Sequence, residues 1–240
     1  MTALPDEVPD EVVVLVGGLG TRLRPVVADV PKPLAPVAGR PFLHWLLEGF
    51  ARQGLRRAVL AAGYRAAMVR ASLGARFAGI EIAYAEEESP RGTGGAVWAA
   101  LPLCTGPRVF VANGDSWIGM ALDRLAAAPA ADLVLTVRAV EDRARYGSVL
   151  VEGDRVVGMA EKGGQGPGLV NAGLYLMRRD LPVRRPMPAA FSLEHEVLGR
   201  PEGLDVRAVV TDAPFLDIGT PEDYAAAQAL IPRWAGGGRV

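Results

Sequence analysis

The sequence contains little of several features that define whole classes of protein. Its single cysteine, Cys104, excludes an internal disulfide, which suits a reducing compartment. The 26 basic and 27 acidic side chains leave a net charge of −1, so no basic excess favours nucleic acid. No apolar stretch approaches the roughly 20 residues of a membrane span, and the first residues lack the basic and apolar regions of a signal peptide. We therefore expect a cytoplasmic protein that binds neither nucleic acid nor membrane.

Histidine is equally scarce, with only His44 and His195 in the chain. Neither has the spacing of a metal-ligand pair, so we interpret both as surface or half-buried residues. Chemistry at this protein's site must therefore be carried by other side chains.

Strand-like and helix-like segments alternate along the chain, which predicts an α/β fold with helices on both faces of a mostly parallel sheet. Strands are expected near residues 12–16, 57–62, 80–84, 108–113 and 132–139. A hairpin at 146–159 and a strand at 169–177 would add antiparallel pieces, making the sheet mixed. No repeat or linker divides the chain, so we predict a single domain over residues 1–240 with its core at about 11–231.

Two helices carry clear sequence signals. Residues 41–54 place five large apolar side chains on one helical face and end at Gly54, which predicts a crossover helix. Residues 220–230 begin with Thr220 as N-cap, followed by Pro221 and two acids, as is typical of a helix start.

A glycine-rich turn after the first predicted strand is the most informative segment. The apolar run 12–16 leads into Gly17, Gly18 and Gly20, where successive N–H groups can turn toward one anionic group. Thr21 and Arg22 follow at once, and Lys32 stands between two prolines. This combination of glycine turn and fixed cations predicts a polyphosphate site.

Two better-known phosphate loops do not fit this turn. A P-loop would end in Gly-Lys-Ser/Thr, whereas this turn ends in Gly20-Thr21-Arg22. The dinucleotide-binding fingerprint requires a third glycine where Leu23 stands, which disfavours a nicotinamide-dependent oxidoreductase.

Two aspartates suggest a metal. Asp115 follows the apolar run 109–112, so its carboxylate is expected at the carboxyl end of a central strand, where open α/β sheets place ligands. Asp217 lies between apolar residues just before the predicted capped helix. Either aspartate alone could be a turn or cap residue, but two carboxylates on adjacent loops can hold one Mg²⁺.

The segments 17–25 and 31–41 resemble the signature of the sugar-1-phosphate nucleotidyltransferases, and the resemblance extends over residues 11–231. Within that group, residues 26–36 and 41–43 are most similar to the bacterial D-glycero-α-D-manno-heptose 1-phosphate guanylyltransferases. The resemblance implies a Rossmann-like, nucleotide-diphospho-sugar transferase fold, with an NTP and a sugar 1-phosphate as substrates. It leaves a homo-oligomer open.

The resemblance also implies roles for individual residues. Catalysis would rest on Arg22, Lys32 and Asp115, and Mg²⁺ would be held by Asp115 and Asp217. The nucleotide would lie against the turns at 17–22 and 92–94, that is, against Gly17, Gly18, Gly20, Thr21, Arg22, Gly92, Thr93 and Gly94.

The sugar phosphate would be bound by Glu161, Lys162, Asn171 and Gly173. By residue type alone, a surface ion pair and a turn explain these four positions equally well. Gly163 stands where the family commonly has proline.

These observations predict Mg²⁺-dependent nucleotidyl transfer, with GTP and D-glycero-α-D-manno-heptose 1-phosphate as the preferred pair. Mannose-1-phosphate guanylyl transfer, and thymidylyl or uridylyl transfer to another sugar 1-phosphate, stay open. A catalytically silent domain that binds nucleotide sugars is the alternative from another class, and the intact charged residues argue against it.

Overall fold

A ten-stranded mixed sheet forms the centre of the molecule, in the order β10-β11-β13-β9-β12-β7-β1-β4-β6-β5. The computed structural model describes residues 8–18, 20–23, 25–143, 147–160 and 164–236. In chain order the strands of this sheet are β1 (Glu11–Leu15), β4 (Arg57–Ala62), β5 (Arg76–Phe77), β6 (Ile80–Glu86), β7 (Arg108–Asn113), β9 (Leu133–Val140), β10 (Ser148–Glu152), β11 (Arg155–Ala160), β12 (Gly168–Arg178) and β13 (Val206–Thr211).

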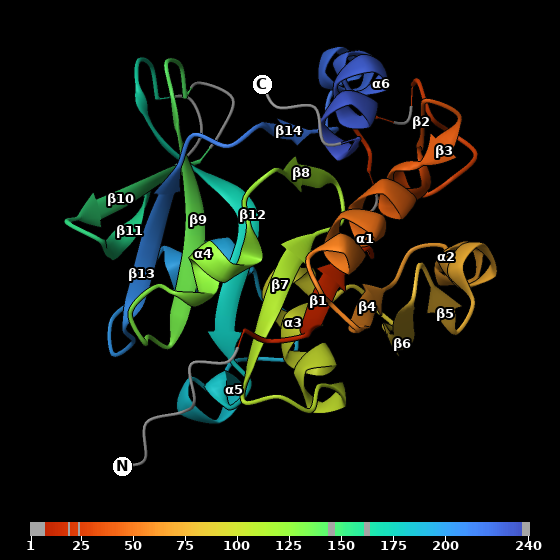
Figure 1. Cartoon of the computed structure of the whole chain (residues 1–240). Coiled ribbons are helices and arrows are strands. Elements are labelled where there is room, and N and C mark those ends of the chain that lie inside the picture. Colours follow the sequence, from red (N-terminus) through yellow and green to blue (C-terminus); the bar gives the residue numbers. More distant parts are fainter. Residues whose placement is uncertain (1–7, 19, 24, 144–146, 161–163, 237–240) are drawn as a thin grey trace.

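Helices cover both faces of this sheet, so the predicted three-layer α/β architecture is confirmed (Figure 1). Alternate residues of β1 point to opposite faces: Val12 and Val14 pack into one core and Val13 into the other. The first core contains side chains of α1 (Phe42–Arg52), α2 (Ala66–Leu73), α4 (Leu122–Ala126) and α6 (Pro221–Ala235). The second contains side chains of α3 (Gly92–Ala100), α5 (Leu181–Arg184), the 3₁₀ turn η2 (Leu101–Leu103) and the π-helical turn η3 (Glu194–Leu198).

The two helices with clear sequence signals are confirmed with small shifts of their ends. α1 buries Phe42, Leu43, Leu46, Leu47 and Phe50, the five large apolar residues of the predicted face. α6 begins after Thr220, whose hydroxyl accepts a hydrogen bond from the Asp223 N–H at 3.2 Å, and it continues to Ala235. No helix among the described residues is long and apolar enough to cross a membrane.

Pairing in the sheet divides it into two parts. β7, β1, β4 and β6 are parallel neighbours, as the alternation of strands and helices in the first half predicted. β12 is antiparallel to both β7 and β9, and β10 is antiparallel to β11. The predicted mixed character is therefore confirmed, but antiparallel pairing takes a larger share than "mostly parallel" implied, because β12 inserts antiparallel between β7 and β9 and β10 and β11 form a hairpin. Of the described strands after residue 148, β13 alone has a parallel neighbour, β9.

Two short ribbons complete the strands. β2 (Pro36–Val37) pairs with β3 (Arg40–Pro41) just before α1. β8 (Ser116–Ile118), which follows β7 after a two-residue turn, pairs with β14 (Phe215–Asp217), which leads toward α6. Figure 1 shows this β8–β14 ribbon beyond the carboxyl end of β7, next to α6. It therefore brings a segment from the end of the chain to the edge where ligands bind in α/β sheets.

Candidate active site

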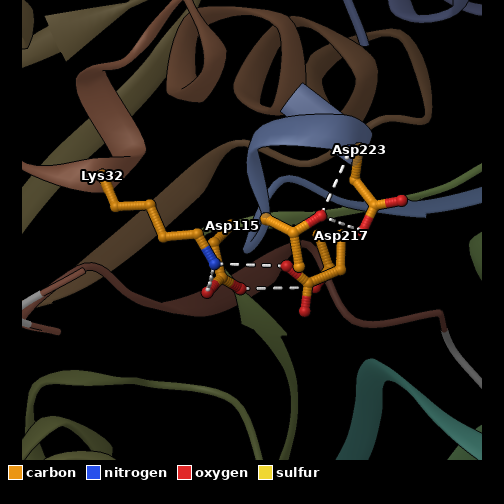
Figure 2. Close-up of polar contacts among 6 residues, drawn as sticks. Lys32, Asp115, Asp217 and Asp223 are labelled. Atoms are coloured by element: carbon orange, nitrogen blue, oxygen red, sulfur yellow. Dashed lines mark hydrogen bonds and ion pairs between the residues drawn. The ribbon is translucent and has the colours of Figure 1, made fainter. Parts of the chain in front are cut away.

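Lys32, Asp115 and Asp217 form one charged cluster at the carboxyl end of the parallel strands (Figure 2). The Lys32 ammonium lies 2.7 Å from Oδ2 of Asp115 and 3.1 Å from Oδ1 of Asp217. These residues are 83 and 185 positions from Lys32 in the sequence. The structure thus brings together the cation and both acids that the sequence analysis selected.

Each member of this cluster is positioned by its own element. Lys32 begins the 3₁₀ turn η1 (Lys32–Leu34), which is fixed by Pro31 and Pro33 and anchored by buried Leu34. Asp115 lies in the two-residue turn between β7 and β8, and Asp217 ends β14, where it stands opposite Ser116 in the ribbon. The Ile218 N–H donates to the carbonyl of Asp115 at 3.0 Å, so the backbone itself holds the two acidic segments together.

The charges in this cluster depend on one another. Burial alone would lower the pKa of Lys32, but the charges of Asp115 and Asp217 outweigh it and raise that pKa above its ordinary value. Burial, and after it the charge of Asp115, raises the pKa of Asp217, while Lys32 opposes this shift. A positive charge is therefore favoured between the two carboxylates.

The glycine turn lies directly against Lys32. Gly20 has a left-handed backbone with φ of 58°, and a Cβ there would stand 2.9 Å from the Cβ of Lys32. Its carbonyl accepts the N–H of Leu23 at 3.1 Å, and the Leu23 side chain, only 2% exposed, is buried in the core. A glycine at the position of Leu23 would lose this packing.

Two cavities meet at this cluster. The smaller, of about 250 Å³, is lined by Gly18, Gly20, Thr21, Arg22, Lys32 and Asp115 together with neighbours. The larger, of about 1050 Å³, is lined by Asn171, Ser192, Glu194, His195, Asp217 and Asp223 among others. Arg22, Thr93, Asn113 and Gly219 line both, so the cavities join beside the charged residues. Such a pair of cavities suits two substrates that react at a shared anionic group.

Comparison with known proteins agrees with this geometry. The family model described as "Nucleotidyl transferase" matches residues 11–233. The chain belongs to the nucleotidyl transferase family. It is 36% identical over 229 residues to the D-glycero-alpha-D-manno-heptose 1-phosphate guanylyltransferase of Aneurinibacillus thermoaerophilus, covering 93% of this chain and 99% of that protein.

Two further proteins are similar to this chain over most of its length. The mannose-1-phosphate guanylyltransferase of Mycobacterium tuberculosis is 36% identical over 232 residues, covering 93% of this chain and 65% of that protein. The crystal structure of HddC from Yersinia pseudotuberculosis complexed with GMP-PN superposes with a TM-score of 0.82 at 35% identity, covering 91% of this chain and 97% of that one.

In this nucleotidyl transferase, some of the residues predicted to bind the nucleotide line the smaller cavity and others do not. Gly18, Gly20, Thr21 and Arg22 line the smaller cavity. Gly17 instead packs against Gly63, whose N would lie 3.0 Å from an added Cβ.

The second predicted nucleotide turn is held by protein contacts. The Gly94 N–H donates to the carbonyl of Phe191 at 3.1 Å, and a Cβ on Gly92 would stand 2.5 Å from the same oxygen. Thr93 lines both cavities, but its hydroxyl donates to Oε2 of Glu194 at 2.5 Å and accepts the Leu193 N–H at 2.9 Å. The Thr93 hydroxyl therefore makes hydrogen bonds within the protein, and Gly92 and Gly94 leave room for the segment at 191–194.

The predicted sugar-phosphate residues lie around the larger cavity or outside the described residues. Glu161 and Lys162 fall among the residues that the structure does not describe. Asn171 lines the larger cavity, and each end of its amide makes one hydrogen bond within the protein: Nδ2 donates to the Tyr175 hydroxyl at 2.7 Å and Oδ1 accepts the Gly173 N–H at 2.9 Å. Within the described residues, the second N–H of Nδ2 and the second lone pair of Oδ1 stay available to a ligand. Gly173 lies beside Asn113.

Several residues of the larger cavity were not among the site residues selected from the sequence, although the stretch 192–198 resembles a family segment near the sugar site. Glu194 is held by the hydroxyls of Thr93 and Ser192, at 2.5 and 2.9 Å, and projects from a π-helical turn, a conformation common at functional sites. Asp223, in the first turn of α6, exchanges hydrogen bonds with Thr220 (Figure 2). Asn113 stands two residues before Asp115 at the end of β7, and that position was the signal that could have identified it.

Proposed function

We propose that this chain transfers the GMP group of GTP to D-glycero-α-D-manno-heptose 1-phosphate, forming the GDP-sugar and releasing pyrophosphate. The observation that carries the proposal is the cluster of Lys32, Asp115 and Asp217 at the junction of two cavities. The similarity to a heptose 1-phosphate guanylyltransferase along nearly its whole length, and to a protein crystallised with GMP-PN, supports the choice of base and sugar.

The smaller cavity is proposed to receive the nucleotide phosphates. Its glycine turn offers backbone N–H groups, and Arg22 and Lys32 add positive charge. The larger cavity is proposed to receive the sugar, since Glu194, Asn171 and Asp223 line it with groups that can hydrogen-bond hydroxyls. Glu161 and Lys162 stay predictions for the sugar phosphate.

The residues at the junction fit Mg²⁺. Asp115 and Asp217 both contact the Lys32 ammonium, so their carboxylates lie close enough together to share a cation, and Mg²⁺ is commonly held by one or two carboxylates with water and substrate phosphates. When bound there, Mg²⁺ would neutralise phosphate charge and help the pyrophosphate to leave.

The reaction needs no general base from the protein. A sugar 1-phosphate is largely a dianion near neutral pH, because its second pKa is about 6, so its oxygen can attack the α-phosphorus directly. A new bond forms between that oxygen and the α-phosphorus. The bond between the α-phosphorus and the oxygen that bridges it to the β-phosphate breaks, and this oxygen leaves with the pyrophosphate. Arg22 and Lys32 offset the repulsion between the two anions and hold them in line.

An assay of pyrophosphate release tests the proposal. GTP, dTTP, UTP and CTP are each offered with heptose 1-phosphate, mannose 1-phosphate and glucose 1-phosphate. We expect the highest kcat/KM for GTP with D-glycero-α-D-manno-heptose 1-phosphate, because a pocket built to bind the extra hydroxyl leaves polar groups unpaired with the shorter sugar. If a different nucleotide or a hexose phosphate gives the highest kcat/KM, the substrate assignment is wrong.

A further inference from the structure

Asn113 occupies the junction between the two cavities. It ends β7 and stands beside Leu15 of β1 in the parallel register. It lines both the nucleotide cavity and the sugar cavity, a property that it shares with Arg22, Thr93 and Gly219. A side chain at this point is close to the place where the two substrates must meet.

The amide of Asn113 lacks hydrogen-bond partners in the part of the chain that the structure describes. Its Oδ1 is buried without a partner, and no described residue hydrogen-bonds its Nδ2. Asn171, on the neighbouring strand, uses both ends of its amide within the protein. A buried amide oxygen is costly when unpaired, so the unpaired Oδ1 beside a binding cavity indicates a bond made to a ligand.

The backbone of β12 fixes this amide from one side. The pairing of β12 with β9 shifts register between Asn171 and Tyr175, and Gly173 inside this bulge has φ of 73°. A Cβ on Gly173 would stand 2.7 Å from Nδ2 of Asn113. Glycine therefore allows β12 to pack against the amide, and this contact limits its movement away from the cavities.

We propose that Asn113 hydrogen-bonds the 2-hydroxyl of the sugar 1-phosphate and so selects the configuration at carbon 2. This inference rests on the proposed function. Carbon 2 is bonded to the carbon that carries the phosphate, so its hydroxyl is the nearest one to the reacting group. A side chain at the junction of the cavities reaches that hydroxyl before any other on the sugar.

The other groups near the junction suit Asn113 less well. The phosphates are already served by the charges of Arg22 and Lys32, which bind anions more strongly than a neutral amide does. The ribose hydroxyls are the other neutral groups that an amide could bind, and an assay with 2′- and 3′-deoxy-GTP distinguishes them from the sugar hydroxyl. A neutral amide suits a neutral hydroxyl, because its N–H can donate to the hydroxyl oxygen and its carbonyl oxygen can accept the hydroxyl proton.

A substrate and mutation cycle tests this assignment. The wild-type enzyme and Asn113→Leu are each assayed with GTP and either D-glycero-α-D-manno-heptose 1-phosphate or its 2-deoxy analogue. We expect wild type to prefer the 2-hydroxy sugar by about tenfold or more in kcat/KM, and Asn113→Leu to show a preference below about threefold. Leucine has the same number of side-chain heavy atoms as asparagine but makes no hydrogen bond.

The ratio of the two kcat/KM values does not depend on how much of the variant is folded, because both sugars meet the same enzyme. Asn113→Ser serves as a second variant if the leucine variant gives no active enzyme. Gln53→Met is the matched control, because the Gln53 side-chain oxygen accepts the Leu122 N–H away from both cavities. We expect this control to keep the wild-type ratio.

The outcomes separate the two proposals. An equal loss on both sugars in the Asn113 variants would overturn the assignment, and so would a coupling that appears with 2′- or 3′-deoxy-GTP instead. Equal kcat/KM values of the wild type for the 2-hydroxy sugar and its 2-deoxy analogue would also overturn the assignment of Asn113. The proposed function would still stand in that case. Absence of turnover with GTP and any manno-configured sugar phosphate would contradict the proposed function itself.

Discussion

The lysine between two aspartates is the central feature at the scale of single residues. The Lys32 side chain is 11% exposed, so its charge is compensated mainly by Asp115 and Asp217 rather than by water. The two carboxylates in turn repel each other, and the raised pKa of Asp217 follows from its burial and from this repulsion. The cluster therefore places one ammonium group and two carboxylates close together, where a reaction between anions requires a cation and a metal ligand.

Replacing Asp115 or Asp217 by asparagine should lower the rate of pyrophosphate release by at least about a hundredfold at saturating Mg²⁺. The amide keeps the shape of the side chain and removes only its charge, and Lys32 keeps one carboxylate partner. We expect the melting temperature to change little. The control is Asp123→Asn, which changes an exposed aspartate on α4. Near-normal turnover in the Asp115 variant would contradict the metal assignment.

The two phosphate sites can be separated by their cations. Arg22→Ala should raise the KM for GTP and lower kcat, because Arg22 lines both cavities, at the junction where the two phosphates are proposed to meet. Lys162→Ala should chiefly raise the KM for the sugar phosphate. Arg76→Ala, an exposed arginine on the edge strand β5, should leave both constants unchanged. If Lys162→Ala altered only the KM for GTP, its assignment to the sugar phosphate would be wrong.

At the scale of elements, the N-terminal turn of α3 is fixed by the segment before η3. Gly94 and Gly95 both donate N–H groups to the Phe191 carbonyl, and Thr93 joins Leu193 and Glu194 by hydrogen bonds. Thr93 and Glu194 are 101 residues apart in the sequence. These contacts connect the nucleotide side of the site with the sugar side through two short elements.

A pair of glycine variants separates packing from ligand contact. A Cβ on Gly94 would lie 2.1 Å from the Phe191 ring, so Gly94→Ala should destabilise the fold by about 1–3 kcal/mol. A Cβ on Gly18 meets nothing within 4 Å and would enter the nucleotide cavity. Gly18→Ala should therefore keep its stability and raise the KM for GTP. Urea unfolding and steady-state kinetics measure the two effects, and equal stability of both variants would refute the Gly94 interpretation.

α1 and α2 meet through a histidine, which predicts a pH effect on stability. A ring nitrogen of His44 lies 2.8 Å from the Ser72 hydroxyl, and burial, followed by the charge of Arg40, lowers the pKa of His44. The unfolded chain therefore takes up this proton first as the pH falls below about 6.5. The free energy of unfolding should therefore decrease as the pH falls below that value.

His44→Gln provides the comparison for this pH effect. Glutamine can still hydrogen-bond Ser72 but does not titrate, so the variant should lose less stability between pH 7 and pH 5.5 than wild type does. Urea unfolding across that range measures the difference. Parallel pH dependences for the two proteins would show that His44 does not contribute.

At the scale of the whole molecule, the two cavities depend on residues from distant parts of the chain. Ligands that bind them stabilise the folded state, because the unfolded chain has no such site. GTP with Mg²⁺ at a hundred times its Kd should raise the free energy of unfolding by about 2.7 kcal/mol. Thermal unfolding should show smaller shifts with UTP, CTP and dTTP at the same concentration, and an equal shift with UTP would contradict the preference for guanine.

The sequence by itself determined the features that depend on neighbouring residues. Apolar runs predicted the parallel strands, Thr220 and Pro221 predicted the start of α6, and glycines followed by Arg22 predicted a turn, which lines the smaller cavity. Asp115 could be placed at the end of a strand because the run before it is apolar. Each of these follows from the chemistry and spacing of a short segment, which local preferences govern.

Only the tertiary structure decided which distant groups meet. The pairing of β14 with β8 brings Asp217 to Asp115, and the close packing of β12 on β7 leaves the Asn113 amide unpaired at the junction of the cavities. The share of antiparallel strands and the use of Thr93 as a partner of Glu194 were likewise not predictable from the sequence. These contacts depend on strand order and register, which are set by the packing of the whole sheet and are not encoded in any one segment.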